Sequence, residues 1–169
     1  MSTFLVLTVI ADDKPGIVEQ LAATITEHGG NWLESRMAQM AGKFAGILRV
    51  GIEEESSNGL IGALSALGGR GISVIAELSN SAGDTNNTKD LTLSVVGNDR
   101  PGIVREVSQV LARLNVNVLE LTTSCESAEM SALPIFKSEA QLRVPEGFDS
   151  HDLADALEAI SDDLMVEIL

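Results

Sequence analysis

Hydrophobic residues along the chain recur at two spacings that alternate from segment to segment. Residues 3–10 form a nearly continuous apolar run, which predicts a strand covered on at least one face. The apolar residues after it recur every three or four positions, as on one face of a helix, until Gly29-Gly30 ends the pattern. Residues 31–41 and 44–52 then predict two further strands.

A second helix and a fourth strand complete this first unit. Ser56 and Ser57 are suitable N-caps, and the apolar residues after them keep a helical spacing up to Gly68. Residues 72–78 predict the last strand. The order strand, helix, strand, strand, helix, strand is typical of an α+β sandwich. We therefore predict a ferredoxin-like βαββαβ unit with two helices on one face of a four-stranded antiparallel sheet.

The same pattern returns in the second half of the chain. Residues 13–18 (Asp-Lys-Pro-Gly-Ile-Val) reappear 86 positions later as residues 99–104 (Asp-Arg-Pro-Gly-Ile-Val). Each copy follows an apolar strand and precedes a helical pattern, which indicates a duplicated domain. The second copy has eight additional residues between its middle strands, and the segment 126–136 is expected to hold them as an extended hairpin or a flap.

The duplication predicts two small domains. The first spans residues 1–79 and the second residues 91–169, with a polar surface linker over residues 80–90. Units of this size bury only a modest core. The free face of each sheet is therefore expected to be solvated, paired with the other unit, or used to form a homo-oligomer.

The charge of the chain argues against a nucleic-acid ligand. The 169 residues include 25 acidic and 11 basic side chains, for a net charge of −14, and show no dense cluster of Lys and Arg. A phosphate backbone would be repelled by most of this surface. A basic protein partner is compatible with the same charge.

Composition also limits the chemistry and the location. With Cys125 as the only cysteine and two histidines, neither a multi-cysteine metal site nor a Ser-His-Asp set can be built. We expect Cys125 to be reduced and packed as a small apolar residue, and we predict no cofactor. The first apolar run is too short for a membrane span and lacks the basic leader of a signal peptide. A cytoplasmic protein is the prediction.

The repeated turn offers the clearest candidate chemistry. Pro15 suits the first position of a helix, and Gly16 has no Cβ and lets another group approach the backbone. The N–H groups of residues 16–18 would lack intrahelical acceptors, so they could bind a carboxylate with help from the helix dipole. Asp13 could cap the helix or hold an ammonium group, and Asn31 could support its own turn or reach the same ligand. The alternative is that this sequence only turns the chain and starts a helix.

The βαββαβ unit with Asp-x-Pro-Gly-Ile-Val at its first strand–helix turn resembles an ACT domain. ACT domains are small regulatory modules that commonly bind amino acids, often between two paired copies. The resemblance covers both halves of the chain and implies a regulator with no catalytic residue and no metal. It implies that the ligand-binding residues are Asp13, Pro15, Gly16, Ile17 and Asn31, and again Asp99, Pro101, Gly102, Ile103 and Asn117.

A chain made of two such domains, with Ser-Ala-Leu-Pro-Ile-Phe at residues 131–136, resembles the glycine cleavage system transcriptional repressors. That resemblance implies a protein that responds to glycine and contacts a DNA-binding transcriptional activator rather than DNA. The second unit has Asn115-Val116 where the first has Gly29-Gly30. Its site is therefore either shaped differently or purely structural.

Two other functions are compatible with the same fold. One is an interaction or dimerisation module that binds no ligand. The other is a small enzyme such as an acylphosphatase, whose chemistry requires an arginine in the first loop. The first unit offers only Lys14 there, and the second offers Arg100.

Overall fold

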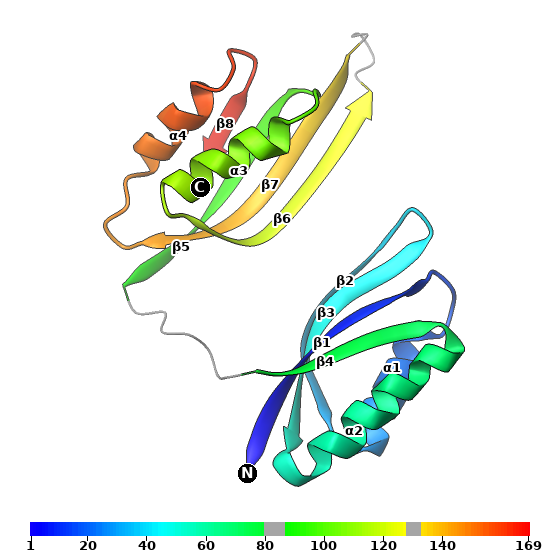
Figure 1. Cartoon of the computed structure of the whole chain (residues 1–169). Coiled ribbons are helices and arrows are strands. Elements are labelled where there is room, and N and C mark those ends of the chain that lie inside the picture. Colours follow the sequence, from blue (N-terminus) through cyan, green and yellow to red (C-terminus); the bar gives the residue numbers. More distant parts are fainter. Residues whose placement is uncertain (80–86, 128–132) are drawn as a thin grey trace. The chain divides into compact units, whose positions relative to one another are not determined.

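The computed structural model describes residues 1–79, 87–127 and 133–169 (Figure 1). The chain divides into two compact units, Met1–Gly83 and Asp84–Leu169, which we call unit 1 and unit 2. Unit 1 consists of β1 (Ser2–Asp12), α1 (Ile17–Glu27), β2 (Asn31–Met40), β3 (Lys43–Glu53), α2 (Glu54–Ala66), a short 3-10 helix η1 (Leu67–Arg70) and β4 (Ile72–Ser79). Unit 2 consists of β5 (Thr88–Asn98), α3 (Ile103–Arg113), β6 (Asn117–Ser127), β7 (Pro134–Pro145), α4 (Ser150–Glu158) and β8 (Met165–Ile168).

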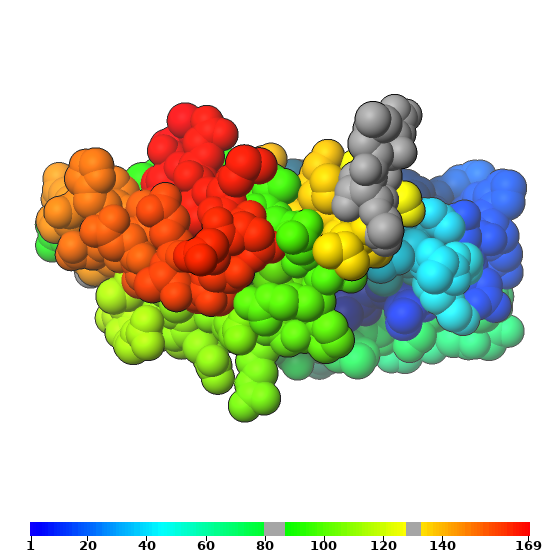
Figure 2. All heavy atoms as spheres, turned by 90° about the horizontal axis from the view of Figure 1, so that it is seen from above, coloured from blue at the N-terminus to red at the C-terminus, as the bar shows by residue number. Residues whose placement is uncertain are grey.

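Each unit has one antiparallel sheet with its helices on a single face. The strand orders are β2-β3-β1-β4 in unit 1 and β6-β7-β5-β8 in unit 2, so the first strand of each unit lies inside its sheet. Figure 2 shows α4 beside the end of the chain that includes β8, in orange and red. The predicted βαββαβ order and α+β class are confirmed in both units.

The core of each unit lies between the helices and the sheet. In unit 1, alternate residues of β1 face the helices, and Leu5, Leu7 and Val9 are fully buried there. Leu21 of α1 and Leu64 of α2 close the same cluster. Burying a leucine of this kind stabilises the fold by about 1.5–3 kcal/mol. An aliphatic core therefore suffices, although only 3% of the chain is aromatic.

The repeated turns start their helices later than the sequence suggested. Helix α1 begins at Ile17, and Gly16 before it has φ +96° in the left-handed region. Gly102 has φ +87° in the same place before α3. The prediction that Pro15 occupies the first helical position was wrong, because the left-handed glycine lies between the proline and the helix. Only glycine adopts this conformation without a steric cost.

One other helix start also differs from the prediction. Helix α2 begins at Glu54 directly after β3, so Ser57 is not a cap but a buried first-turn residue whose hydroxyl donates to the Glu54 carbonyl at 2.8 Å. In unit 2, Asp149 caps α4 by accepting from the His151 N–H at 2.8 Å. Short polar side chains compete for such positions, and spacing alone does not decide between them.

The predicted linker is shorter than residues 80–90. Strand β5 begins at Thr88, and residues 88–90 pair with residues 143–145 of β7. This end of β5 has a neighbour on one side only, because β8 pairs with residues 93–96. Residues 88–90 are therefore exposed and polar, and for this reason the sequence pattern assigned them to the linker. The remaining part, residues 80–86, lies outside the described residues.

The predicted excursion at residues 126–136 is described only at its flanks. Strand β6 continues to Ser127 and pairs there with Pro134, so both flanks extend the hairpin. Residues 128–132 lie outside the described part of the chain. Cys125, on β6, is exposed rather than packed in a core as predicted. Among the described helices, none has the length and apolar character needed to cross a membrane.

Candidate functional site

The first β–α turn presents a row of backbone donors. The Gln20 N–H donates to the carbonyl of Gly16 at 3.0 Å, which is the first bond of α1. The N–H groups of Ile17, Val18 and Glu19 precede that bond and have no intrahelical acceptor. Aligned peptide dipoles place partial positive charge at this end of the helix, so these donors favour a negatively charged group.

A surface pocket of about 230 Å³ lies at this turn. The predicted residues Asp13, Gly16 and Ile17 contribute to its lining. It is bounded by Asp13, Lys14, Gly16, Ile17, Val18, Glu19 and Phe44. The pocket thus combines two carboxylates, one ammonium group, backbone donors and an aromatic wall, and it offers partners for both charges of a free amino acid.

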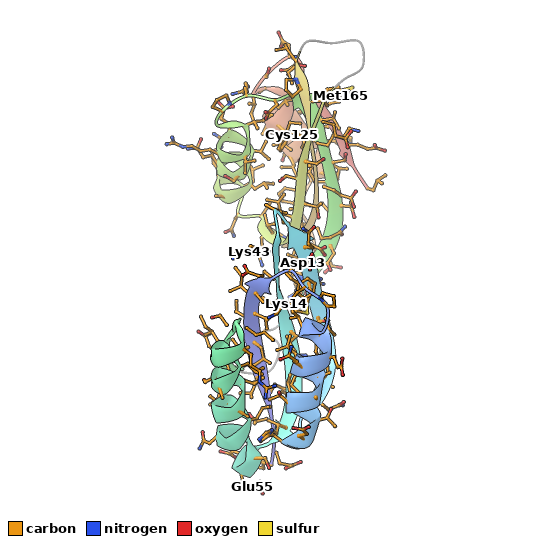
Figure 3. The ribbon with its side chains drawn as sticks, turned by 90° about the vertical axis from the view of Figure 1, so that its right-hand side faces the viewer. Asp13, Lys14, Lys43, Glu55, Cys125 and Met165 are labelled. Atoms are coloured by element: carbon orange, nitrogen blue, oxygen red, sulfur yellow. The ribbon has the colours of Figure 1, made fainter. Side chains whose placement is uncertain are left out.

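The turn is held in place from the β2–β3 hairpin. The Asp13 N–H donates to the carbonyl of Gly42 at 2.9 Å. Beside it, Lys43 forms an ion pair with Asp12, and its hydrogen bond and charge lower the pKa of the Asp12 carboxyl. Figure 3 shows Asp13, Lys14 and Lys43 together at one end of unit 1, with Glu55 at the opposite end.

Lys14 has only a weak internal contact. Its ammonium group lies 3.4 Å from the carbonyl of Arg70, at the end of η1. This distance is long for a charged donor. Lys14 is therefore available to a ligand anion at little cost. Sequence reasoning considered Lys14 only as a phosphate-binding residue and missed Phe44, whose proximity depends on the pairing of β3 with the end of β1.

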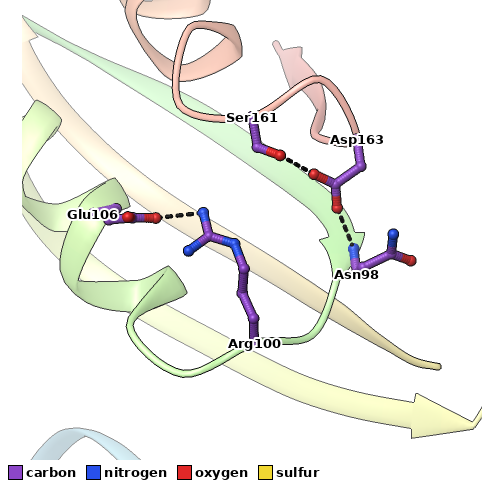
Figure 4. A network of polar contacts seen from close by, with 5 residues as sticks. All are labelled: Asn98, Arg100, Glu106, Ser161 and Asp163. Carbon is purple, nitrogen blue, oxygen red and sulfur yellow. Dashed lines mark hydrogen bonds and ion pairs between the residues drawn. The ribbon is translucent and has the colours of Figure 1, made fainter.

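The second turn uses its charges internally (Figure 4). Arg100 forms an ion pair with Glu106 of α3, and the hydrogen bond from Arg100 to Glu106 raises the pKa of the guanidinium group. The Ile103 N–H donates weakly to the Arg100 carbonyl at 3.4 Å, so one helix donor is partly engaged. The cation of the second turn is therefore paired with a carboxylate of its own helix.

Asp163 fastens the end of β5 beside this turn. Its carboxylate accepts from the Asn98 N–H at 2.8 Å and also from the Ser161 hydroxyl. The Ser161 hydrogen bond, followed by the Asn98 N–H, lowers the pKa of Asp163. On the other side, desolvation and a hydrogen bond with Asp99 raise the pKa of the Cys125 thiol. Asp99 thus interacts with Cys125 on the neighbouring strand β6.

The structure separates the predicted asparagines from the turns. Asn31 pairs with Gly51, and Gly51 pairs with Phe4 near the start of β1, whereas the turn follows Asp12 at the other end. Eight residues at about 3.3 Å each put the two ends about 26 Å apart. In unit 2, Asn117 is separated from Asp99 in the same way. Within one unit, Asn31 cannot reach a ligand held at the first turn.

The remaining predicted residues stay close to their turns. Pro15 and Pro101 lie directly before the left-handed glycines, and Ile103 is buried as the first residue of α3. Within the described residues, no three His, Cys, Asp or Glu side chains are grouped as a metal site would require.

The fold and the turns define a class of protein, and family models agree with it. ACT-domain models match residues 3–70 and residues 91–162. The chain therefore belongs to the ACT-domain family, with two such domains in tandem. A comparison with curated protein sequences gave no match.

Two solved structures resemble the whole chain. A protein of unknown function from Galdieria sulphuraria is 23% identical with a TM-score of 0.83, covering 99% of this chain and 98% of its own. A candidate glycine cleavage system transcriptional repressor is 19% identical with a TM-score of 0.74, covering 100% of this chain and 98% of its own. Because both identities are below 25%, the likeness shows only that the three chains share the tandem fold.

Proposed function

We propose that this chain is a non-enzymatic, amino-acid-responsive regulator whose ligand binds at the first β–α turn. The observation that carries the proposal is the pocket at that turn, where Asp13, Lys14 and the donors of α1 meet. ACT domains are amino-acid-sensing modules, and a tandem ACT chain has the right architecture for this role. Unit 2 repeats the turn but neutralises its cation, so unit 1 is the principal binding unit.

The pocket favours one orientation of the ligand. The ligand carboxylate lies against the N–H groups of Ile17 and Val18, with the Lys14 ammonium group nearby, and the ligand ammonium group lies against the Asp13 carboxylate. Phe44 forms an aromatic wall of the pocket. Glycine is the proposed ligand, because the chain is similar in fold to a candidate glycine cleavage system transcriptional repressor.

The affinity expected for glycine suits a metabolite sensor. Glycine has about five heavy atoms, and the best small ligands gain at most about 1.5 kcal/mol per atom. The upper limit of about 7.5 kcal/mol corresponds to a dissociation constant on the order of micromolar. Binding at this strength shifts a conformational equilibrium only by the difference in affinity between two states.

The proposed output is contact with a transcription factor. The structural likeness to a candidate glycine cleavage repressor supports a role in regulating that system in the cytoplasm. A net charge of −14 is unfavourable for direct binding to DNA. The proposed partner is therefore a DNA-binding activator, and glycine alters the affinity of the two proteins for each other.

Calorimetric titration with glycine tests the ligand step. We expect saturable heat for the wild type, at least tenfold weaker binding for Gly16→Val, and nearly unchanged binding for Gly102→Val as the matched control. Asn31 lies far from the pocket within unit 1. Asn31→Ala should therefore leave glycine binding unchanged if the site lies within unit 1, and should weaken it if the site needs another domain. If no proteinogenic amino acid at about 10 mM gives a binding heat, the proposed ligand site is wrong, and the alternative of an interaction module that binds no ligand is favoured.

A further inference from the structure

The sheet face of unit 1 that points away from the helices is apolar at its centre. In an antiparallel sheet, paired residues point to the same side. Val6 pairs with Arg49, Thr8 with Ile47, and Ile10 with Ala45, and none of these side chains faces the core. Ile47 and Ile10 are each 49% exposed, and Ile75 of β4 beside them is 59% exposed. We call this surface the outer face of unit 1.

Unit 2 shows that the fold does not need an apolar outer face. The core positions agree between the units, for example Leu7 with Leu93 and Leu48 with Leu142. On the outer face, five of the same registers replace an apolar residue by a polar one, whereas Ile10 corresponds to Val96 and Ser73 to Met165. The replacements from unit 1 to unit 2 are Phe4 to Asp90, Val6 to Thr92, Ala45 to Glu139, Ile47 to Gln141 and Ile75 to Glu167. A selective apolar face of this kind is typical of a contact surface.

The charges of the outer face balance one another, and most of them lie on its edge strands. Glu34 and Arg36 are on edge strand β2, and Glu77 is on edge strand β4. Arg49 lies on β3, next to edge strand β2. Its guanidinium carbon is 5.1 Å from the centre of the Phe4 ring, and its Nε is 3.0 Å from a carboxylate oxygen of Glu34. An apolar centre with a charged rim is the usual anatomy of a protein interface. The balance also avoids the repulsion that a net charge of −14 would otherwise impose on two copies.

The outer face has both a hollow and a projecting side chain at the same position along the strands. The hollow, of about 190 Å³, lies over β2, β3 and β1 and is lined by Val6, Glu34, Ser35, Arg36, Ile47, Leu48 and Arg49. The projection is Ile75 on β4, in the register row of Thr8 and Ile47.

We propose that the outer face of unit 1 binds the same face of a second copy of this chain. Consider a two-fold axis that lies between the two faces and runs parallel to the strands. It reverses the strand order β2-β3-β1-β4 and leaves the position of each residue along the strand direction unchanged. It therefore places β4 of one copy over β2 of the other, with Ile75 at the hollow. Glu77, two residues further along β4, then lies over Glu34 of the other copy, in the row that also contains Arg49. The face is thus complementary to itself in shape.

The area of the face is sufficient for a specific dimer. Four strands about 4.8 Å apart and about nine residues long, at about 3.3 Å per residue, cover roughly 570 Å². Two faces together bury on the order of 1,100 Å², which is at the lower limit of specific interfaces. We therefore expect a reversible dimer with a micromolar dissociation constant.

Sedimentation analysis of the full chain between about 1 µM and about 1 mM tests this proposal. The wild type is expected to reach twice the chain mass of 17.8 kDa within that range. The double variant Ile47→Gln, Ile75→Glu introduces the residues that unit 2 tolerates at the same positions. It should raise the dissociation constant at least thirtyfold while circular dichroism and thermal unfolding stay unchanged.

Glu139→Gln on the outer face of unit 2 is the matched control and should leave dimerisation intact. A wild type that has the mass of one chain over the whole range would overturn the proposal, including the case in which the face binds a different protein. A wild-type dimer that the double variant does not weaken would also overturn it, by locating the interface elsewhere. Neither result depends on whether glycine binds at the first turn.

Discussion

The two β–α turns have almost the same backbone but opposite arrangements of charge. Gly16 and Gly102 have φ +96° and +87°, and each directly precedes a helix. In unit 1, the Lys14 ammonium group lies 3.4 Å from the Arg70 carbonyl oxygen, and its charge also acts on Asp12. In unit 2, Arg100 forms an ion pair with Glu106, which occupies the position of Gln20 in unit 1. The change from Gln20 to Glu106, together with that from Lys14 to Arg100, thus pairs the cation of the second turn with a carboxylate.

This difference teaches that a repeated motif need not be a repeated site. The glycine is retained in both units because the turn requires a left-handed residue, whether or not a ligand binds. The charge around it is not required by the turn and is free to differ. The pocket in unit 1 therefore reflects Lys14 and Phe44 as much as the Asp-x-Pro-Gly sequence itself.

The largest expected effect tests what the two units share. Leu7 and Leu93 occupy the same position in the two cores and are 0% and 2% exposed. Each substitution to Ala should lower the free energy of unfolding of its own unit by about 2–5 kcal/mol, through lost burial and a cavity. Denaturant unfolding measures both. A loss below about 1 kcal/mol in either variant would contradict an equivalent core.

The next effect separates the turns by function. Gly16→Val and Gly102→Val should each cost about 1–2 kcal/mol of stability, because a side chain is strained in the left-handed region. No clash adds to this cost, since a Cβ at Gly16 would have its nearest neighbour at 3.9 Å. Thermal unfolding measures the shared loss. Equal losses of glycine affinity in both variants would refute the difference between the turns.

A smaller effect tests the two cations. Lys14→Gln should weaken glycine binding about two- to fivefold, as expected for one partly exposed charge contact. Arg100→Gln should leave binding unchanged, because the removed charge is already paired with Glu106. Glu106→Gln is the sharper variant, since it gives unit 2 the arrangement of unit 1. It should add a second, weak binding event in calorimetry, and no change in stoichiometry would count against the charge argument.

The smallest effect concerns pH and belongs to unit 2 alone. Because its hydrogen bonds lower the folded-state pKa of Asp163, its contribution to stability is present above its usual pKa of about 3.8. That contribution is lost as the pH falls through the lower folded-state value. Asp163→Ala should therefore be less stable than the wild type at pH 7, with the difference shrinking below about pH 4. A difference that stays constant down to about pH 3 would contradict this prediction.

The sequence was sufficient for the fold but only partly for the site. Helical and strand spacings, with the 86-residue repeat, predict the α-helices and strands in the right order because the apolar periodicity reflects the core, whereas the short 3-10 helix η1 was not predicted. Residues 88–90 were misassigned because a polar strand end resembles a linker. Asn31 was grouped with the turn because it ends the same helix–strand connection, whereas antiparallel pairing sends it to the far end of the sheet. Phe44 was missed because its position depends on register.

The most direct test of the ligand site is a glycine titration of the ¹⁵N-labelled full chain, followed by amide chemical shifts. The account predicts saturable shifts first at Ile17, Val18 and Glu19, whose N–H groups face the ligand carboxylate. It predicts much smaller shifts at Ile103 and the following residues of α3, and the loss of the unit 1 response in Gly16→Val. Shifts confined to unit 2, or no shift at about 10 mM glycine, would contradict it.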